Sequence, residues 1–121
     1  MTDPYLYTVS NNVATFSIND APWNLMSLDY IDRLEEQLPE VLADDQIRAM
    51  IFTGEGLDNF SAGINLKQIP AGTKRAGSSE AFLGQRHRVL DMIERGGIPA
   101  IATLYGYCLG GGLELPLACH F

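Results

Sequence analysis

The chain lacks several features that mark large protein classes. It has two cysteines, two histidines and only eight basic residues against 15 acidic ones, which gives a formal net charge of −7 over 121 residues. Duplex nucleic acids are usually bound by a basic face, so no nucleic-acid partner is expected. Every apolar run is interrupted by glycine, proline or a charged residue before it could span a bilayer, so no membrane partner is expected either.

The N-terminal residues and the few cysteines and histidines suggest in which cellular compartment the protein is found. Met1–Pro4 has neither the basic nor the apolar region of a signal peptide and is too acidic for a typical transit peptide. Cys108 and Cys119 lie among apolar residues, which predicts buried thiols in a reducing compartment. His87 and His120 are far apart in the sequence and have no ligand-spaced partners, so no metal site is predicted. We therefore expect a cytoplasmic protein.

The composition is that of one folded domain. Hydrophobic residues make up 46% of the chain and charged residues 19%, which argues against disorder, and the length allows a single domain with a real core. Five of the basic residues lie close together in the sequence: Lys67, Lys74, Arg75, Arg86 and Arg88. This cluster could form a local site for an anionic ligand or a solvated loop and helix face, and the pattern alone does not decide between them.

Strand signals alternate with helix signals along the chain. Residues 5–10 and 13–18 are β-rich runs on either side of Asn11-Asn12, which is typical of a hairpin. Residues 49–53 form a compact apolar run of the kind found in buried parallel strands. Strands that alternate with helices imply βαβ crossovers, so the sequence predicts an α/β fold with a mostly parallel sheet.

Two helices are expected from apolar residues at helical spacing. The first covers residues 28–42, with Ser27 as its N-cap, and Pro39 should kink or split it. The second covers residues 80–95. Between them, residues 70–79 form the most loop-like tract, which we expect to be mobile.

The stretch Pro99–Cys119 carries the strongest local signal for a binding site. An apolar run at 100–104, a turn at Tyr105-Gly106 and three glycines at 110–112 lead into a second apolar run whose only charge is Glu114. This order predicts a buried strand, a tight turn and a buried helix entered through glycines. Unshielded N–H groups at such a helix start can hold an oxygen that carries negative charge. Glu114 could then serve proton chemistry, or only complement the helix dipole.

Two segments together resemble the paired oxyanion-hole motifs of a known family. On its own, Asn59–Lys67 (NFSAGINLK) could be an ordinary strand-to-helix turn or a place where a ligand approaches the backbone. Together with Gly106–Leu115 (GYCLGGGLEL), it resembles the two motifs of the crotonase superfamily, the enoyl-CoA hydratase/isomerase proteins. Trp23–Ser27 resembles the loop before that family's first helix. The resemblance covers essentially the whole chain.

The resemblance implies a crotonase-like superhelix of repeated ββα and βα units, here truncated. Residues 1–121 would form the N-terminal portion of an acyl-CoA-binding domain whose C-terminal part is absent. The thioester oxygen of an acyl-CoA would lie between the backbone amides of Ile64 and Gly111, and losing one such donor typically costs about 3–4 kcal/mol. The residues implied to line the CoA site are Ala62, Ile64, Asn65, Leu66, Lys67 and Gly111. Lys67 would meet a phosphate or remain a surface lysine.

The resemblance also implies a reaction. Glu114 matches the first of two glutamates with which hydratases add water across the 2,3-double bond of an enoyl-CoA. The second glutamate would lie beyond Phe121, so we expect the isolated 121 residues to be inactive. The coenzyme A thioester is the substrate and no covalently bound cofactor is implied. The full-length protein would be a homotrimer or hexamer.

Other functions stay open at this point. Isomerase, hydrolase, decarboxylase and dehalogenase activities occur in the same family, and a non-catalytic module that binds acyl-CoA or a protein is a further alternative. A nucleotide phosphate loop at 110–112 is disfavoured, because no Gly-Lys-Ser/Thr ending follows. Two residues depart from the family pattern. Asn65 stands where the family usually has an acidic residue, and Pro116 is uncommon at its position.

Overall fold

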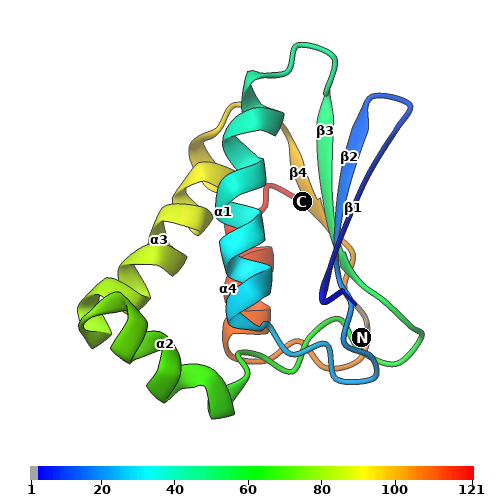
Figure 1. Cartoon of the computed structure of the whole chain (residues 1–121). Coiled ribbons are helices and arrows are strands. Elements are labelled where there is room, and N and C mark those ends of the chain that lie inside the picture. The colour runs from blue at the N-terminus through cyan, green and yellow to red at the C-terminus, as the bar shows by residue number, and fades with distance from the viewer. Residues whose placement is uncertain (1–2) are drawn as a thin grey trace.

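A computed structural model describes residues 3–121, and in it all the helices cover one face of a four-stranded sheet (Figure 1). Met1 and Thr2, which belong to the segment considered as a targeting sequence, lie outside the described residues. The strand order is β1-β2-β3-β4, with β1 antiparallel to β2 and the pairs β2–β3 and β3–β4 parallel. The strands are β1 (Tyr5–Ser10), β2 (Val13–Ile18), β3 (Ala49–Gly54) and β4 (Ala100–Ala102). The predicted α/β fold with a mostly parallel sheet is confirmed.

The hairpin and the first crossover form as the local sequence predicts. Asn11 and Asn12 have φ of 51° and 65°, the left-handed conformations that a two-residue hairpin turn needs and that asparagine tolerates well. Helix α1 (Leu28–Ala43) begins at the predicted cap, where Ser27 Oγ accepts a hydrogen bond from the Tyr30 amide at 3.1 Å. Pro39 does not split this helix, because it lies on the exposed side, where water can bind the carbonyl left unpaired.

The core lies between α1 and the sheet. Phe16 and Phe52 stack on neighbouring strands with ring centroids 4.8 Å apart, and both are fully buried. Leu34 and Leu38 on α1 are fully buried against the same face. These side chains belong to one core cluster that joins α1 to the sheet.

The expectation of a mobile loop at 70–79 is wrong. After a short 3₁₀ helix, η1 (Leu66–Gln68), the chain forms α2 (Ile69–Ala76). Pro70 is tolerated because the first helical turn has no use for its missing N–H, and Gly77 ends the helix with φ of 98°. Gly72 is buried, and it must be glycine-sized because a Cβ there would lie 2.8 Å from side-chain atoms of Leu28 and Phe82. Pro70 and Gly77 therefore lie at the two ends of a helix, and Gly72 lets that helix pack closely against its neighbours.

Helix α3 (Ser79–Arg95) agrees with the prediction, and its N-cap is Ser78, whose Oγ accepts from the Ala81 amide at 3.0 Å. Strand β4 is two residues shorter than expected. The predicted burial of the last helix, α4 (Gly111–Ala118), is wrong: Leu117 is 72% exposed and Glu114 is exposed. Among the described residues α4 packs against α3, so only part of its surface is covered.

Two absences bear on the membrane and metal-binding functions discussed above. Within residues 3–121, no helix has both the length and the apolar character needed to cross a membrane. In the same part of the chain, no group of three His, Cys, Asp or Glu side chains is placed to hold a metal ion. Cys108 and Cys119 are half-buried free thiols rather than fully buried ones, and burial raises the pKa of Cys119 to about 12.

Candidate functional site

The two loops that carry the predicted motifs lie side by side beyond the ends of β3 and β4. The Phe60 amide donates to the Tyr105 carbonyl at 2.8 Å, and the Ser61 amide donates to the Tyr107 carbonyl at 3.1 Å. The Leu109 amide then donates back to the Ser61 carbonyl at 3.1 Å. These bonds continue the parallel pairing of the sheet into the loops. Both segments therefore meet at the carboxyl edge of the strands, where open α/β sheets commonly bind ligands.

Glycines let the two loops approach closely at this edge. Gly63 has φ of 117°, and a Cβ there would lie 3.1 Å from the Leu109 carbonyl oxygen and 3.7 Å from the Gly111 amide nitrogen. A Cβ on Gly111 would lie 2.9 Å from Cγ1 of Ile64. The backbones around Ile64 and Gly111 thus come together at one place, and side chains at the two glycines would hold them apart.

The amides of Ile64 and Gly111 carry no hydrogen bond. Among residues 3–121, neither N–H donates to a backbone or side-chain acceptor, whereas the amides of Gly63, Asn65 and Gly112 do. Asn65 donates to the Met26 carbonyl at 3.1 Å, and Gly63 donates to a serine hydroxyl at 3.1 Å. Backbone amides in folded proteins are almost always paired, so two adjacent free donors are available to an acceptor from outside the chain.

Both loops line one open groove of about 650 Å³. This volume lies within the range of small-molecule sites. All six residues predicted to line the CoA site are on its wall: Ala62, Ile64, Asn65, Leu66, Lys67 and Gly111. Lys67 and Leu66 are exposed, and Lys67 is the basic residue of the groove. The groove is therefore an accessible surface that a flexible, phosphorylated ligand can reach.

Asn65, the residue that departs from the family pattern, has a clear local role. Its Oδ1 accepts a hydrogen bond from the Lys67 amide at 3.2 Å and caps η1. An acidic residue at this position would offer the same acceptor, so asparagine preserves the cap without the charge. The departure leaves the loop intact.

Glu114 is not among the residues that line the groove. It lies three residues after Gly111 in the first turn of α4 and is exposed. Its negative charge tends to raise the pKa of Arg86, so the carboxylate lies on the Arg86 side of the helix start. The structure therefore brings Ile64 and Gly111 together and leaves Glu114 beside them, near a buried guanidinium.

A buried polar network, which the sequence reasoning missed, holds the first loop. Asn24 is fully buried with φ of 50°, and its Nδ2 donates to the carbonyls of Glu55 and Asn59 at 2.9 and 2.7 Å. Ser61 is also fully buried, and its Oγ donates to the Asn24 carbonyl at 2.7 Å and accepts from the Gly63 amide. Asparagine and serine in a loop are a general turn signal, and the sequence does not indicate that these two are buried.

Asn59 ties the loops to each other. Its Nδ2 donates to the Pro22 carbonyl at 2.8 Å, and its Oδ1 accepts from the Tyr107 amide at 2.8 Å. One buried side chain thus links the segment before α1 with the segment after β4. Such bonds restrict the positions of the amides that follow in each loop.

The basic cluster of the sequence is divided in the structure. Arg75 pairs with Asp32 at 2.9 Å and Arg88 pairs with Glu35 at 3.0 Å, both in solvent, so these two residues belong to a solvated helix face. Arg86 lies between them in sequence but is only 8% exposed. The sequence pattern did not separate this buried arginine from its exposed neighbours, because its register on α3 matters only once α1 and α4 are in place.

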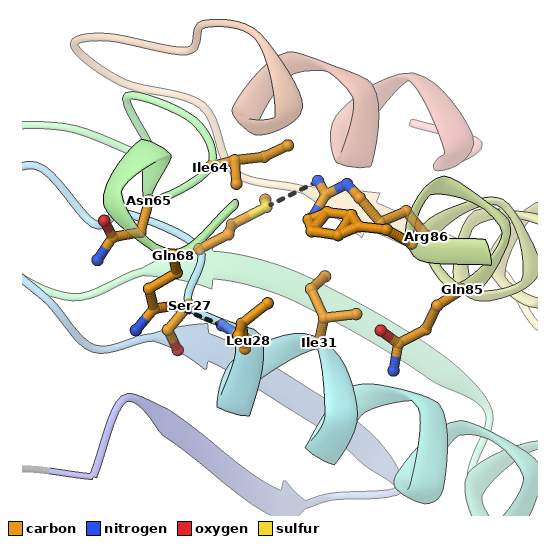
Figure 2. Close-up of a pocket in the computed structure, with 10 residues that line it drawn as sticks. Ser27, Leu28, Ile31, Ile64, Asn65, Gln68, Gln85 and Arg86 are labelled. Atoms are coloured by element: carbon orange, nitrogen blue, oxygen red, sulfur yellow. Dashed lines mark hydrogen bonds between the residues drawn. The ribbon is translucent and has the colours of Figure 1, made fainter. Parts of the chain in front are cut away.

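Arg86 lines a small pocket between α1, α3 and the segment that contains Ile64 and Asn65 (Figure 2). The space in the pocket is about 10 Å³, roughly enough for one water molecule. Arg86 Nη2 lies 3.7 Å from Met26 Sδ, a weak acceptor. Burial lowers the pKa of Arg86 from its usual value. Ile64 lines both this pocket and the groove, so it forms the wall between them.

The sheet, the helices on one face and the paired glycine-containing loops define a protein of the crotonase fold. An enoyl-CoA hydratase/carnithine racemase from Magnetospirillum magneticum superposes with a TM-score of 0.86 at 26% identity, covering 99% of this chain and 45% of that one. An enoyl-CoA hydratase from Bacillus anthracis gives a TM-score of 0.81 at 30% identity, covering 98% of this chain and 46% of that one. The predicted crotonase-like fold is confirmed.

The sequence comparisons agree with the structural ones. Residues 8–121 match the family model Enoyl-CoA hydratase/isomerase. The fatty acid oxidation complex subunit alpha of Shewanella baltica is 34% identical over 108 residues, which is 89% of this chain and 15% of that protein. The chain therefore belongs to the enoyl-CoA hydratase/isomerase family, as predicted. It spans about 15% of the length of the curated relatives it matches and less than half of each of the two solved chains named above.

Proposed function

We propose that residues 1–121 form the N-terminal portion of an acyl-CoA-binding domain, and that the polypeptide containing them hydrates enoyl-CoA thioesters. The observation that carries the proposal is the pair of free amides, Ile64 and Gly111, which adjoin one groove from two separate crossovers. Two fixed donors at one point fit an oxygen on which charge develops during a reaction. The groove beside them is of a size for part of a CoA ester.

In the proposed reaction the thioester oxygen accepts hydrogen bonds from the two amides. Water adds its oxygen to C3 and its proton to C2, and the C2–C3 double bond becomes single. The negative charge that builds on the thioester oxygen during this addition is stabilised by donors that are already in place, so little reorganisation is needed. Glu114 holds the water and transfers its proton, together with a second glutamate that the family resemblance places beyond Phe121.

The CoA portion lies along Ala62, Asn65, Leu66 and Lys67 in this proposal. The phosphates are negatively charged, and Lys67 is the basic side chain on the groove wall. No covalently bound cofactor takes part. In the cytoplasm the complete polypeptide forms a homotrimer or hexamer, which light scattering of the purified protein tests directly.

One observation favours a second candidate, a non-catalytic acyl-CoA-binding module. Glu114 is exposed and is not among the residues that line the groove, so the amides could hold a thioester without proton chemistry beside it. Binding without turnover is the mark of this second function.

Hydration of crotonyl-CoA by the natural polypeptide that contains this chain separates the two functions. Loss of the absorbance of the conjugated thioester reports turnover, and Glu114→Gln should lower kcat by about a hundredfold or more, since it removes the proton-transferring group. Glu36→Gln, on the exposed side of α1, is the matched control and should change nothing. If crotonyl-CoA binds but is not hydrated, and the Glu114 variant behaves as wild type, the module function is correct. Absence of any acyl-CoA binding would overturn both.

A further inference from the structure

Arg86 is a buried positive charge placed against the start of α4. Its Nη2 lies 2.7 Å from the point where a Cβ on Gly111 would stand, so the guanidinium lies directly behind this residue. The side chain is nine-tenths buried, and no carboxylate within residues 3–121 pairs with it. Among residues 3–121, the guanidinium has one hydrogen-bond contact, to the weakly accepting sulfur of Met26. Figure 2 shows Ile64 and Arg86 pointing toward one another above α1.

This arrangement is electrostatically unfavourable. The N-terminal end of a helix carries partial positive charge, and Arg86 adds a full positive charge beside it. Burial without a paired counter-ion costs free energy, and burial lowers the pKa of Arg86 accordingly. Two titratable groups, Glu114 on α4 and Tyr30 on α1, oppose the effect of burial, because negative charge on either one raises the pKa of Arg86. Glu114 is exposed and Tyr30 is a neutral phenol, so neither replaces a buried ion pair.

The pocket that Arg86 lines does not explain the charge. Its space of about 10 Å³ is roughly enough for one water molecule and leaves no room for the carboxylate of a ligand. The guanidinium does lie beside Gly111, whose amide, like that of Ile64, is free. A negative charge at that point would meet two N–H donors, a helix N-terminus and a guanidinium at once.

We propose that Arg86 is a supporting charge for the oxyanion site, which strengthens the hold of the Ile64 and Gly111 amides on a negatively polarised thioester oxygen. This inference rests on the proposed function and adds a residue to the same site. Arg86 acts from behind the backbone and does not touch the substrate. Its burial keeps solvent from screening the charge, which makes it effective over a distance at which an exposed arginine would be weak.

The test uses the natural polypeptide and a thioester whose colour reports polarisation. In para-dimethylaminocinnamoyl-CoA the amino group donates electrons toward the carbonyl, so positive potential at the thioester oxygen moves the absorption to longer wavelength. The variants are Arg86→Met, which removes the charge and keeps an unbranched apolar side chain, and Arg86→Lys, which keeps the charge. Arg88→Met on the same helix removes an exposed charge and serves as the control.

Arg86→Met should reduce the red shift of the bound probe and lower kcat for crotonyl-CoA by about tenfold with little change in KM, as expected for a lost charge near a transition state. Arg86→Lys should recover part of both effects, and Arg88→Met should match wild type. Since the buried charge is unpaired, Arg86→Met should unfold at the same or a higher urea concentration than wild type. An unchanged red shift in Arg86→Met would overturn the inference, as would a loss of stability large enough to explain the loss of activity.

The outcomes also distinguish a failure of this inference from a failure of the proposed hydratase function on which it rests. If wild type binds the probe without any red shift, the two amides do not polarise a thioester and the proposed function fails. If wild type shifts the probe and Arg86→Met shifts it equally, the amides act alone and only the role of Arg86 is rejected.

Discussion

The half of the molecule built from β1, β2, α1 and β3 differs sharply from the half built from the two loops, α3 and α4. In the first half, large apolar side chains such as Phe16, Phe52 and Leu34 are fully buried. The second half exposes Leu113 and Leu117 on α4 and buries the charge of Arg86. Although Phe60, Val89 and Ile93 of the second half join the same core, the exposed leucines of α4 and the buried charge belong to the second half. The second half carries free donors and an unpaired cation, which are the costs expected where chemistry takes place.

The largest effect is expected from a cavity in the first half. Phe16→Ala removes a fully buried ring that stacks on Phe52, and should lower the free energy of unfolding by about 3–5 kcal/mol. Urea unfolding followed by circular dichroism measures the change. Val9→Ala, at a half-exposed position in β1, is the control and should cost well under about 1 kcal/mol. A small effect of Phe16→Ala would contradict the division into a stabilising and a chemical half.

Gly111→Ala tests the second half. The added Cβ would lie 2.7 Å from Arg86 Nη2 and 2.9 Å from Ile64 Cγ1, so both must move away from the free amides. We expect hydration to fall by about a hundredfold, as when one oxyanion donor is lost, with a much smaller change in stability. Gly84→Ala in α3, where the Cβ would have ordinary contacts, is the matched control and should be neutral or slightly stabilising. Equal activities of the two variants would disprove the role of this glycine.

The smallest effect is expected at Tyr30, where the two halves meet. Its hydroxyl is buried without a hydrogen-bond partner, and burial raises the pKa of the phenol above its usual value. The folded protein therefore keeps this proton while the unfolded chain loses it above pH of about 10, so stability should fall as pH rises past that point. Tyr30→Phe should gain about 1 kcal/mol at neutral pH and lose less stability in alkali. Unfolding midpoints of both proteins between neutral and alkaline pH measure this; parallel curves would contradict it.

The sequence predicted those parts of the fold that depend on short-range signals. Asn11-Asn12 sets the hairpin and Ser27 caps α1 through local hydrogen bonds, so both could be recognised without the rest of the chain. The two loop segments were found from their motifs, and the structure places them side by side. The site role of Ile64 and Gly111 remains a prediction.

The remaining features depend on packing between distant segments. The sequence predicts a loop where α2 forms, because glycine and proline are turn residues, whereas Gly72 is needed for close contact with Leu28 and Phe82. The burial of Arg86 and the exposure of Glu114 follow from how α3 and α4 pack, and helical spacing does not specify this. The polar network around Asn24 was missed for the same reason.

The hydrogen bond from the Tyr107 amide to Asn59 joins residues 48 positions apart, and the backbone bonds beside it join similarly distant segments. Such contacts close only after both crossovers have docked, because long loops must be ordered first. A partly folded or cleaved chain would thus have a native-like hairpin but would not bring the free amides of Ile64 and Gly111 together. The groove and the two free amides beside it would then form late in folding, so the ligand-binding capacity proposed above would be absent from a nascent chain.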